Sequence, residues 1–378
     1  YLKKKKPEIT YRCPDWEKNT GYPLITWTDG ETVEQMTIEQ NIPDKIVRIQ
    51  WADSMVDMVR LLDDRLEEGG CACVIVNTVK MAQKIYEECK RAMEDVNLVL
   101  YHAQFTTPDR YKKEQALLKK MGKASHDRDR YRFILIGTQV LEQSLDYDAD
   151  LMVTQLCPMD LLLQRIGRLH RHSKRDEGEQ DYTRPPGLRD PQCVILREDG
   201  QAYDEGSKAV YGEYLLMRTE QILPGEIKIP GDITALVQKV YDEDDDLGLS
   251  GQLYMDARNQ HKERRKGKKQ EAKSYLLEKP SSKTIQAILD NLEGSSEKTA
   301  EAAVRDGVSS IEVLLMKMGE EGKVLFPGES GDKSIGLSVM ETPDSVQGRK
   351  VAMERLKLPH VFGAVWNRDK TIRELEEI

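Results

Sequence analysis

The chain has 378 residues, with 57 lysines and arginines against 66 aspartates and glutamates, so its formal net charge is −9. The longest apolar runs, such as Phe133-Ile134-Leu135-Ile136, are far shorter than the roughly 20 residues that a membrane helix needs. The basic first residues have no apolar stretch after them, which excludes a signal peptide, and the initial tyrosine indicates a fragment or a processed chain. We therefore expect a protein of two or three domains without a membrane segment.

The six cysteines include no C-x-x-C pair, and Cys71-Ala72-Cys73 is too closely spaced for a zinc knuckle. In a long chain without a secretion signal, such cysteines are typical of reduced thiols, so we expect a cytoplasmic protein. The acidic balance argues against a general nucleic-acid binder. A local basic groove is still compatible with it, because net charge and local field are different quantities.

Residues 1–44 contain four prolines and no sustained hydrophobic period, which predicts an irregular segment. From residue 45 to about 200, strand patterns alternate with helix patterns. Strands are predicted at 45–51, 71–77, 96–101, 132–137, 151–156 and 192–197, with helices after 53, 78 and 107 and over 159–166. This alternation indicates an α/β domain with a mostly parallel sheet and helices on both faces. Ligands collect at the carboxyl ends of the strands in such sheets.

Beyond residue 200 the sequence becomes more charged. Residues 201–280 are interpreted as a charged linker, largely helical, with a helix over 203–222, an acidic run at 242–246 and a basic run at 261–273. Both runs are typical of solvated helices or loops, although the basic run is also compatible with contact to a nucleic-acid backbone. Residues 281–378 are predicted to form a small mixed α+β domain with a helix over 283–292 and strands at 311–316, 323–326 and 335–340.

The strongest local signal is the segment from Gln164 to His172 (QRIGRLHRH), where three arginines follow a predicted helix at spacings of three. Arginine keeps its charge, and its planar fork matches phosphate oxygens. In phosphoryl transfer, an arginine finger stabilises the charge that spreads over the γ-phosphate oxygens. Gly167 allows a close approach of the backbone. The structural alternative for this segment is a surface cluster of salt bridges.

A second polar segment runs from Gly137 to Asp146 (GTQVLEQSLD), directly after the predicted strand 132–137. Small and hydroxylated residues at a strand end suit contact with phosphates through backbone amides and Thr138. The polar side chains of Glu142, Gln143 and Asp146 are interpreted as a link between a nucleic-acid groove and a nucleotide cleft.

These two segments resemble motifs V and VI of the second RecA-like lobe of superfamily 2 helicases, and they are most similar to the CRISPR-associated helicase-nuclease of type I systems. Residues 74–78 (VIVNT) resemble motif IV, and residues 100–110 (LYHAQFTTPDR) resemble a further segment of that family. A weaker resemblance around 302–306 (AAVRD) extends to the family's accessory C-terminal domain. The resemblance covers about residues 45–200 and 281–378, and it implies a RecA-like lobe followed by that accessory domain.

The resemblance also implies roles for individual residues. Arg168 and Arg171 match the catalytic finger arginines that reach ATP bound on a partner lobe. The positions that match the nucleotide side of the cleft are Gln164, Arg165, Gly167 and Asp146. The positions that match contacts to a DNA strand are Asn77, Thr78, His102, Arg110, Gly137, Thr138 and Gln139. Contacts that grip phosphates without reading bases suit a motor, which must step along any sequence.

Other parts of a helicase-nuclease are missing from this sequence. None of the Gly-Lys pairs is followed by serine or threonine, so there is no phosphate-binding P-loop, and there is no D-E-x-H box. His126-Asp127 lies in the charged segment SHDRDR, which is interpreted as a solvated loop rather than a metal site. We therefore expect ATP and magnesium to be held mainly by a missing first lobe, with no cofactor or metal bound by this chain alone.

The resulting hypothesis is the C-terminal half of an ATP-dependent translocase and nuclease of CRISPR interference, inactive by itself. In the whole enzyme the lobes would close on ATP and reopen after hydrolysis, moving 3′ to 5′ along the DNA. The implied partners are single-stranded DNA, the missing nuclease and first RecA-like lobe, and the Cascade surveillance complex, with no membrane. Two alternatives stay open: a non-catalytic module that docks on Cascade or on the missing half, and the lobe of an RNA helicase.

Overall fold

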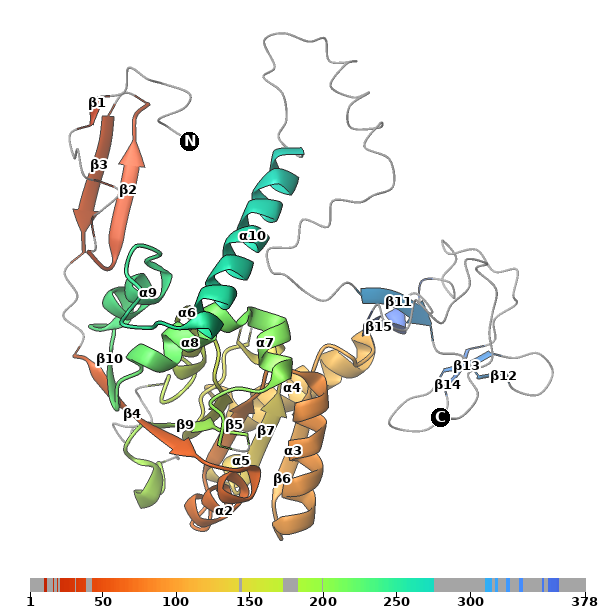
Figure 1. The fold of residues 1–378 in the computed structure, drawn as a ribbon. Helices are drawn as coiled ribbons and strands as arrows, with labels where there is room; N and C mark the ends of the chain where they lie inside the picture. Colours follow the sequence, from red (N-terminus) through yellow and green to blue (C-terminus); the bar gives the residue numbers. More distant parts are fainter. Residues whose placement is uncertain are drawn as a thin grey trace.

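The computed structural model describes residues 10–11, 16, 19, 21–30, 32–38, 43–142, 145–172, 183–198 and 200–274, and short segments at 310–314, 317–318, 324–326, 333–335, 349 and 353–359. Its centre is a seven-stranded sheet in the order β10-β4-β9-β8-β5-β7-β6. All neighbouring strands are parallel except β10, which runs antiparallel to β4 at one edge. The predicted α/β fold with a mostly parallel sheet is therefore confirmed (Figure 1).

The strands of this sheet are short and mostly buried. They are β4 (Lys45–Ala52), β5 (Cys71–Ile75), β6 (Asn97–Tyr101), β7 (Phe133–Gly137), β8 (Leu151–Gln155), β9 (Gln192–Leu196) and β10 (Glu226–Ile229). Ile75 at the end of β5 pairs with Gly137 of β7 and with Thr154 of β8, so three neighbouring strands end at the same level. The segments that follow them therefore meet at one edge of the sheet.

Helices cover both faces of the sheet, as predicted. On one face α2 (Met55–Arg65) and α3 (Val79–Ala92) pack against strand residues such as Val74. On the other face α4 (Thr107–Met121), α6 (Met159–Ile166) and α8 (Glu213–Ile222) pack against residues such as Cys73. Consecutive strand residues point to opposite faces, and this alternation divides the apolar side chains into two cores. Two short turns, α5 (Asp127–Arg130) and η4 (Pro186–Leu188), precede β7 and β9.

The residues after 200 form helices that remain in contact with the lobe. The predicted helix over 203–222 is two helices, α7 (Glu205–Tyr211) and α8, because Gly212 between them has a φ of 82°, a left-handed conformation that favours glycine. α9 (Ile233–Tyr241) contacts α6 and α8, and α10 (Gln252–Ser274) is a long helix that projects away from the sheet (Figure 1).

The acidic and basic runs of this region contact each other. Arg258 on α10 pairs with Asp246 at 3.1 Å and donates to the backbone oxygen of Glu243 at 2.7 Å. Arg265 also pairs with Glu243. Arg218, which is fully buried on α8, donates to the backbone oxygen of Asp245 at 2.7 Å. The acidic run is therefore a loop that fixes α10 against α8, not only a solvated segment.

The N-terminal residues differ from the irregular segment predicted over 1–44. β2 (Leu24–Thr28) and β3 (Thr32–Thr37) form an antiparallel hairpin, and β1 (Thr10–Tyr11) pairs with β3 in parallel. These strands are rich in β-branched residues, which favour extended structure. Pro23 and Pro43 lie on either side of the hairpin, and prolines indicate irregular structure, so the short strand pattern between them was not recognised.

In the C-terminal region, β11 (Ser310–Leu314) pairs with β15 (Arg355–Pro359), and β12 (Lys317–Met318), β13 (Val324–Phe326) and β14 (Lys333–Ile335) form a second small sheet. Strands were predicted over the residues of β11 and β13, whereas β14 overlaps the predicted strand 335–340 only at Ile335. The predicted helix over 283–292 lies outside the described residues.

No helix in the described part of the chain combines the length and the apolar character that crossing a membrane requires. The five cysteines that the structure describes are buried and form no disulfide. Burial raises the pKa of Cys73 and of Cys89 to about 12. These thiols are therefore protonated and pack as small apolar groups.

Candidate nucleotide and nucleic-acid site

Arg165, on the last turn of α6, is the centre of a hydrogen-bond cluster at the carboxyl edge of the sheet. Its side chain is fully buried. Nε and Nη2 donate to Oε1 of Glu142 at 3.0 and 2.8 Å. Nη1 donates to Oγ1 of Thr154 at 2.6 Å and to the last carbonyl groups of β5 and β8 at 3.3 and 3.2 Å. The resemblance places Arg165 on the nucleotide side of a cleft, whereas the structure shows every nitrogen of its guanidinium donating within this chain.

Asn77, two residues beyond β5, belongs to the same cluster. Its side-chain oxygen accepts from Nη2 of Arg165 at 3.0 Å. Its Nδ2 donates to the backbone oxygen of Leu156 at 2.8 Å and to Oγ of Ser207 at 2.7 Å. Its backbone N–H donates to Oε1 of Gln155 at 2.9 Å. Asn77 therefore ties the ends of β5 and β8 together from inside the protein, instead of facing outward as a phosphate contact would.

Gly137 ends β7 where the neighbouring strand β6 comes very close. A Cβ at this position would lie 2.2 Å from the backbone oxygen of Tyr101, a distance that no side chain tolerates. Only glycine therefore allows these two strand ends to approach each other. Thr138, which follows it, is 3% exposed and precedes a turn of 3₁₀ helix, η2 (Gln139–Leu141). Both residues shape the edge, and neither presents a side chain at the surface.

Gln139 connects this turn to the cluster and to α7. Its Nε2 donates to the backbone oxygen of Asn77 at 2.9 Å and to the hydroxyl of Tyr211 at 3.1 Å. The same hydroxyl accepts from Nη2 of Arg165 at 3.0 Å. No pattern in the sequence selects Tyr211, since it lies outside every segment that resembles a motif.

Arg168 and Arg171 lie beyond the end of α6, close to the surface. Arg168 is half-buried, donates from Nη2 to the backbone oxygen of Glu142 at 3.0 Å, and lies over the ring of Tyr147 at 5.6 Å. Arg171 is 43% exposed, and its Nε donates to Oδ1 of Asp146 at 2.8 Å. Burial lowers the pKa of Arg168, and the positive charge of Arg171 lowers it further. Two guanidiniums that repel each other at a surface suit a polyanion that approaches from outside.

The other residues expected on the nucleotide side also lie at the surface. Asp146 is exposed and accepts from Arg171 and from Nε2 of His172, and these hydrogen bonds lower the pKa of its carboxyl. Gln164 is exposed on α6. Gly167 ends that helix, and its N–H donates to the backbone oxygen of Leu163 at 2.9 Å. Residues 167–171 form the loop that follows α6, whereas Gln164 lies on the helix itself. Asp146 reaches this loop from the segment before β8 and pairs with Arg171.

A buried cluster of four charges supports this loop, and sequence reasoning did not find it. Arg130 pairs with Asp150 at 2.8 Å, and Arg184 pairs with Asp148 at 2.8 Å and also with Asp150. All four side chains are at most 2% exposed. Asp148 also accepts from the backbone N–H of Arg171 at 2.8 Å. The prediction that the segment SHDRDR is a solvated loop is therefore wrong at Arg130, which is fully buried. The available signal was a pair of aspartates directly before a buried strand, because carboxylates there need partners.

His170 completes the link between the loop and this charge cluster. Its φ is 47°, it is 7% exposed, and its Nε2 lies 3.1 Å from the backbone oxygen of Asp150. Burial, with a contribution from Arg184, lowers the pKa of His170 to about 4. The imidazole is therefore neutral at neutral pH and packs inside the protein rather than contacting phosphate.

The remaining residues expected to contact DNA differ in exposure. Thr78 is half-buried and begins α3; its Oγ1 accepts from the N–H of Met81 at 3.2 Å, which leaves its own O–H to donate. Arg110 is half-buried on the first turn of α4. His102 is 3% exposed and stacks on Phe105 at 4.3 Å, and burial lowers its pKa to about 4. The histidine is therefore a packing residue.

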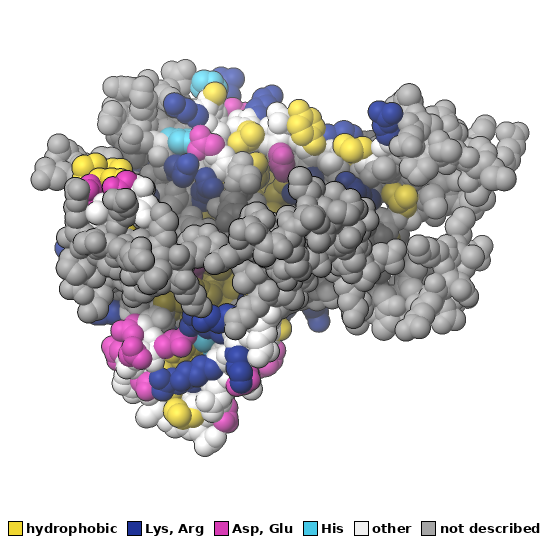
Figure 2. Space-filling model, turned by 90° about the horizontal axis from the view of Figure 1, so that it is seen from above, with side chains coloured by type: hydrophobic (Ala, Val, Ile, Leu, Met, Phe, Trp, Pro, Cys, Tyr) yellow, Lys and Arg dark blue, Asp and Glu magenta, His cyan; other side chains and the backbone are white. Residues whose placement is uncertain are grey.

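The described residues contain no group of three or more His, Cys, Asp or Glu side chains that could hold a metal ion. Lysine and arginine side chains lie beside acidic ones on the described part of the face seen from above (Figure 2). Arg168 and Arg171 are both close to the surface and come from one short loop, so they can meet one anion together.

Comparisons with known proteins place this arrangement in a family. A family model described as CRISPR-associated nuclease/helicase Cas3, C-terminal, matches residues 68–174, which contain both polar segments. The CRISPR-associated nuclease/helicase Cas3 of Streptococcus thermophilus is 35% identical over 376 residues, which is 96% of this chain and 39% of that protein. Over almost its whole length, the chain is similar to the CRISPR-associated nuclease/helicase family. It corresponds to the C-terminal helicase region of that family.

Solved structures of the family share the fold. The crystal structure described as T. fusca Cas3-AMPPNP is 25% identical, with a TM-score of 0.70 over 90% of this chain and 39% of that chain. A CRISPR RNA-guided surveillance complex in a pre-nicking state contains a chain that is 24% identical, with a TM-score of 0.67 over 90% of this chain and 41% of that chain. The present chain thus spans about two fifths of the length of each of these three chains.

Proposed function

We propose that this chain supplies the second motor lobe of an ATP-driven helicase-nuclease that moves single-stranded DNA in CRISPR interference. The observation that carries the proposal is the difference in burial among the arginines of the segment 164–172. Arg165 fixes the strand ends from inside, whereas Arg168 and Arg171 present guanidiniums near the surface only a few residues later. A triphosphate held by a separate lobe would meet these two arginines first. The T. fusca structure described with AMPPNP supports a nucleotide in the whole protein.

Arg168 and Arg171 act as finger arginines in this proposal. Bound ATP and magnesium supply the phosphoryl group and neutralise part of its charge. Arg171 reaches the phosphate by exchanging its bond to Asp146, and this exchange costs little because both side chains are solvent-exposed. Arg168 is oriented by the backbone of Glu142, whose carboxylate is fixed by Arg165. The chain by itself does not hydrolyse ATP, since finger arginines stabilise a transition state that another lobe must position.

The DNA contacts fall on the half-exposed side chains near the same edge, which are Thr78, Arg110 and Gln139. Thr78 offers its O–H at the N-terminus of α3, where the helix dipole also favours a phosphate. Asn77, His102, Gly137 and Thr138 are buried, so they shape the strand ends on which these contacts stand.

The decisive experiment is complementation with the amino-terminal half of the full-length protein. Mixing the two halves should restore ATP hydrolysis that single-stranded DNA stimulates, and Arg168→Ala or Arg171→Ala should remove it. A chain that hydrolyses ATP alone, or finger variants that remain fully active in the mixture, would contradict the proposal.

The same assay separates the alternatives. Stimulation by RNA in place of DNA, compared at one stated salt concentration, would identify an RNA helicase lobe. Binding to the surveillance complex without restored hydrolysis would identify a docking module.

A further inference from the structure

α7 contacts four of the residues expected to face nucleotide or DNA, although it lies outside every segment that resembles a motif. Oγ of Ser207 accepts from Nδ2 of Asn77 at 2.7 Å. The hydroxyl of Tyr211 accepts from Arg165 at 3.0 Å and from Gln139 at 3.1 Å. One short helix therefore bonds to the ends of β5, of β7 and of α6.

Close packing adds to these bonds. Gly206 of α7 lies so near Thr78 that a Cβ there would be 2.9 Å from its Cγ2 atom. The start of α7 is fixed as well, because Asp204 accepts from the backbone N–H of Ser207 at 2.7 Å. A displacement of α7 therefore acts on Thr78, on Asn77 and on Arg165 together.

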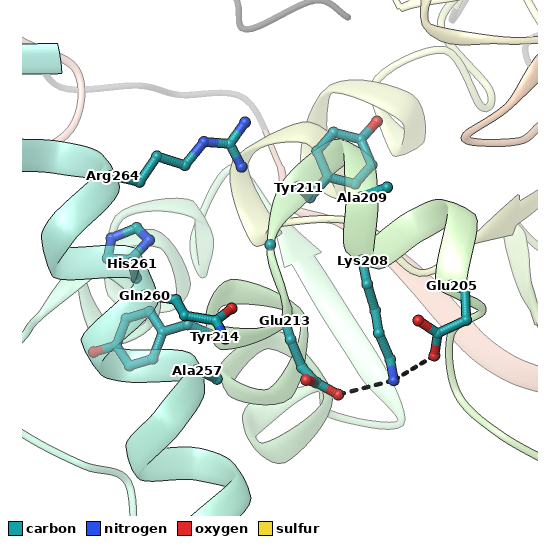
Figure 3. Close-up of a pocket in the computed structure, with 11 residues that line it drawn as sticks. Glu205, Lys208, Ala209, Tyr211, Glu213, Tyr214, Ala257, Gln260, His261 and Arg264 are labelled. Carbon is teal, nitrogen blue, oxygen red and sulfur yellow. Dashed lines mark ion pairs between the residues drawn. The ribbon is translucent and has the colours of Figure 1, made fainter. Parts of the chain in front are cut away.

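Tyr211 also faces the helices that follow the sheet. Its ring lines a pocket of about 410 Å³ between α7, α8 and α10 (Figure 3). Arg264 and His261 reach this pocket from α10, and Lys208 pairs with Glu213 at 3.1 Å on the opposite side (Figure 3). Tyr211 thus contacts the motif cluster with its hydroxyl and the space beneath α10 with its ring.

The chemistry of the hydroxyl suits a fixed connection. Burial raises the pKa of Tyr211 to about 12, so the group is neutral and accepts from a charged guanidinium. Hydrogen bonds with a charged partner are stronger than those between neutral groups. Arg165 in turn fixes Glu142, whose backbone oxygen orients Arg168. A chain of direct contacts therefore runs from the pocket under α10 to a proposed finger arginine.

We propose that Tyr211 is a positioning residue that couples the helices after the sheet to the nucleotide-facing and DNA-facing residues. The inference rests on the proposed function, because its effect on turnover requires a motor. Movement of α10 relative to α7 changes the pocket, shifts the Tyr211 hydroxyl, and alters how Arg165 and Gln139 fix the strand ends.

The test uses Tyr211→Phe, which keeps the ring in the pocket wall and removes only the hydroxyl. In the full-length protein we expect the turnover of ATP with single-stranded DNA to fall about tenfold, the KM for ATP to stay within about twofold, and the ratio of stimulated to unstimulated turnover to fall. Tyr203→Phe is the matched control, since Tyr203 lies in the same region with its ring 5.8 Å from Nζ of Lys208. A Tyr211→Phe protein with unchanged stimulation would overturn the proposal.

A second measurement uses this chain alone and needs no ATP hydrolysis. Hydrogen exchange of the backbone amides at 75–79 and 138–142 should be about tenfold faster in Tyr211→Phe than in the wild type or in Tyr203→Phe. Equal exchange in all three proteins would refute the coupling. A full-length wild type that shows no DNA-stimulated hydrolysis would refute the proposed function instead, and the exchange rates would still decide the role of Tyr211.

Discussion

The arginines on the two sides of Gly167 differ in burial and in their hydrogen-bond partners. On one side, Arg165 is fully buried and all its guanidinium nitrogens donate to groups of its own chain. On the other side, Arg171 is 43% exposed and bonds to Asp146, which is 61% exposed. The buried arginine holds the scaffold together, and the exposed one is available to a ligand. A run of arginines therefore does not predict one role for all its members.

The largest expected effect is on the buried side. Arg165→Ala removes the fully buried ion pair with the carboxylate of Glu142, so we expect the free energy of unfolding to fall by about 3–5 kcal/mol. Urea unfolding of this chain, followed by circular dichroism, measures the change. The exposed neighbour provides the control, because Gln164→Ala should alter stability by less than about 0.5 kcal/mol. Similar stability of the two variants would remove the contrast between the two sides of Gly167.

The exposed side should show the reverse pattern. Arg171→Ala should lower DNA-stimulated ATP turnover of the full-length protein by about 10³-fold, the range typical of a finger arginine, which corresponds to about 4 kcal/mol. The unfolding free energy of this chain should change by less than about 1 kcal/mol, because the pair with Asp146 is exposed. Arg189→Ala, at another exposed arginine, is the matched control and should keep full turnover. A large loss of stability in Arg171→Ala would show that this arginine, like Arg165, has a structural role.

Lowering the pH should weaken the buried side. Burial depresses the pKa of His170 to about 4 from its usual 6.5, so between these values the unfolded chain binds a proton that the folded chain does not. Stability therefore falls as the pH drops through this window, and His170 should account for about 2 kcal/mol of the loss between pH 7 and pH 5. Urea unfolding at both pH values measures it.

The variant His170→Asn isolates the contribution of His170 to the loss of stability at low pH. Asparagine suits this test because it tolerates the positive φ at this position. His102 shifts in the same direction and remains in both proteins, so the variant should still lose stability at low pH, but less than the wild type. Equal pH dependence in the two proteins would show that His170 titrates normally.

The smallest expected effect concerns Asp146, the carboxylate that pairs with the proposed finger arginine Arg171. Asp146→Asn removes an exposed pair, and we expect the free energy of unfolding to change by less than about 0.5 kcal/mol at pH 7. Since Arg171 and His172 lower the pKa of Asp146, its contribution is present above the pKa of the unfolded chain and disappears as the pH falls through that of the folded chain. A loss comparable to that of Arg165→Ala would show that the loop is as rigid as the core.

The elements of the sheet were predictable because their signals are local. The helix over 159–166 was predicted with the bounds that α6 has, and Thr78 does cap α3. Arg168 and Arg171 follow that helix as predicted, whereas Arg165 lies on its last turn. Hydrophobic periodicity and caps depend on residues a few positions apart, so one sequence is enough to find them.

The partners inside the site were not predictable, because they come from distant parts of the chain. The hydroxyl that Arg165 contacts belongs to a residue 46 positions later, and Arg184 joins Asp150 from 34 positions away. Composition placed Arg130 in a solvated loop, and only the tertiary fold shows that it meets two aspartates. Which charges are buried is decided by packing, and no local pattern records it.

The position of β10 matters for anyone who wishes to express the lobe alone. This strand comes from beyond residue 200, yet it supplies the outer neighbour of β4 through four paired residues. A polypeptide truncated at 200 would leave the amides and carbonyls along that side of β4 open to a second molecule, a known route to aggregation. A soluble fragment should therefore continue past Ile229.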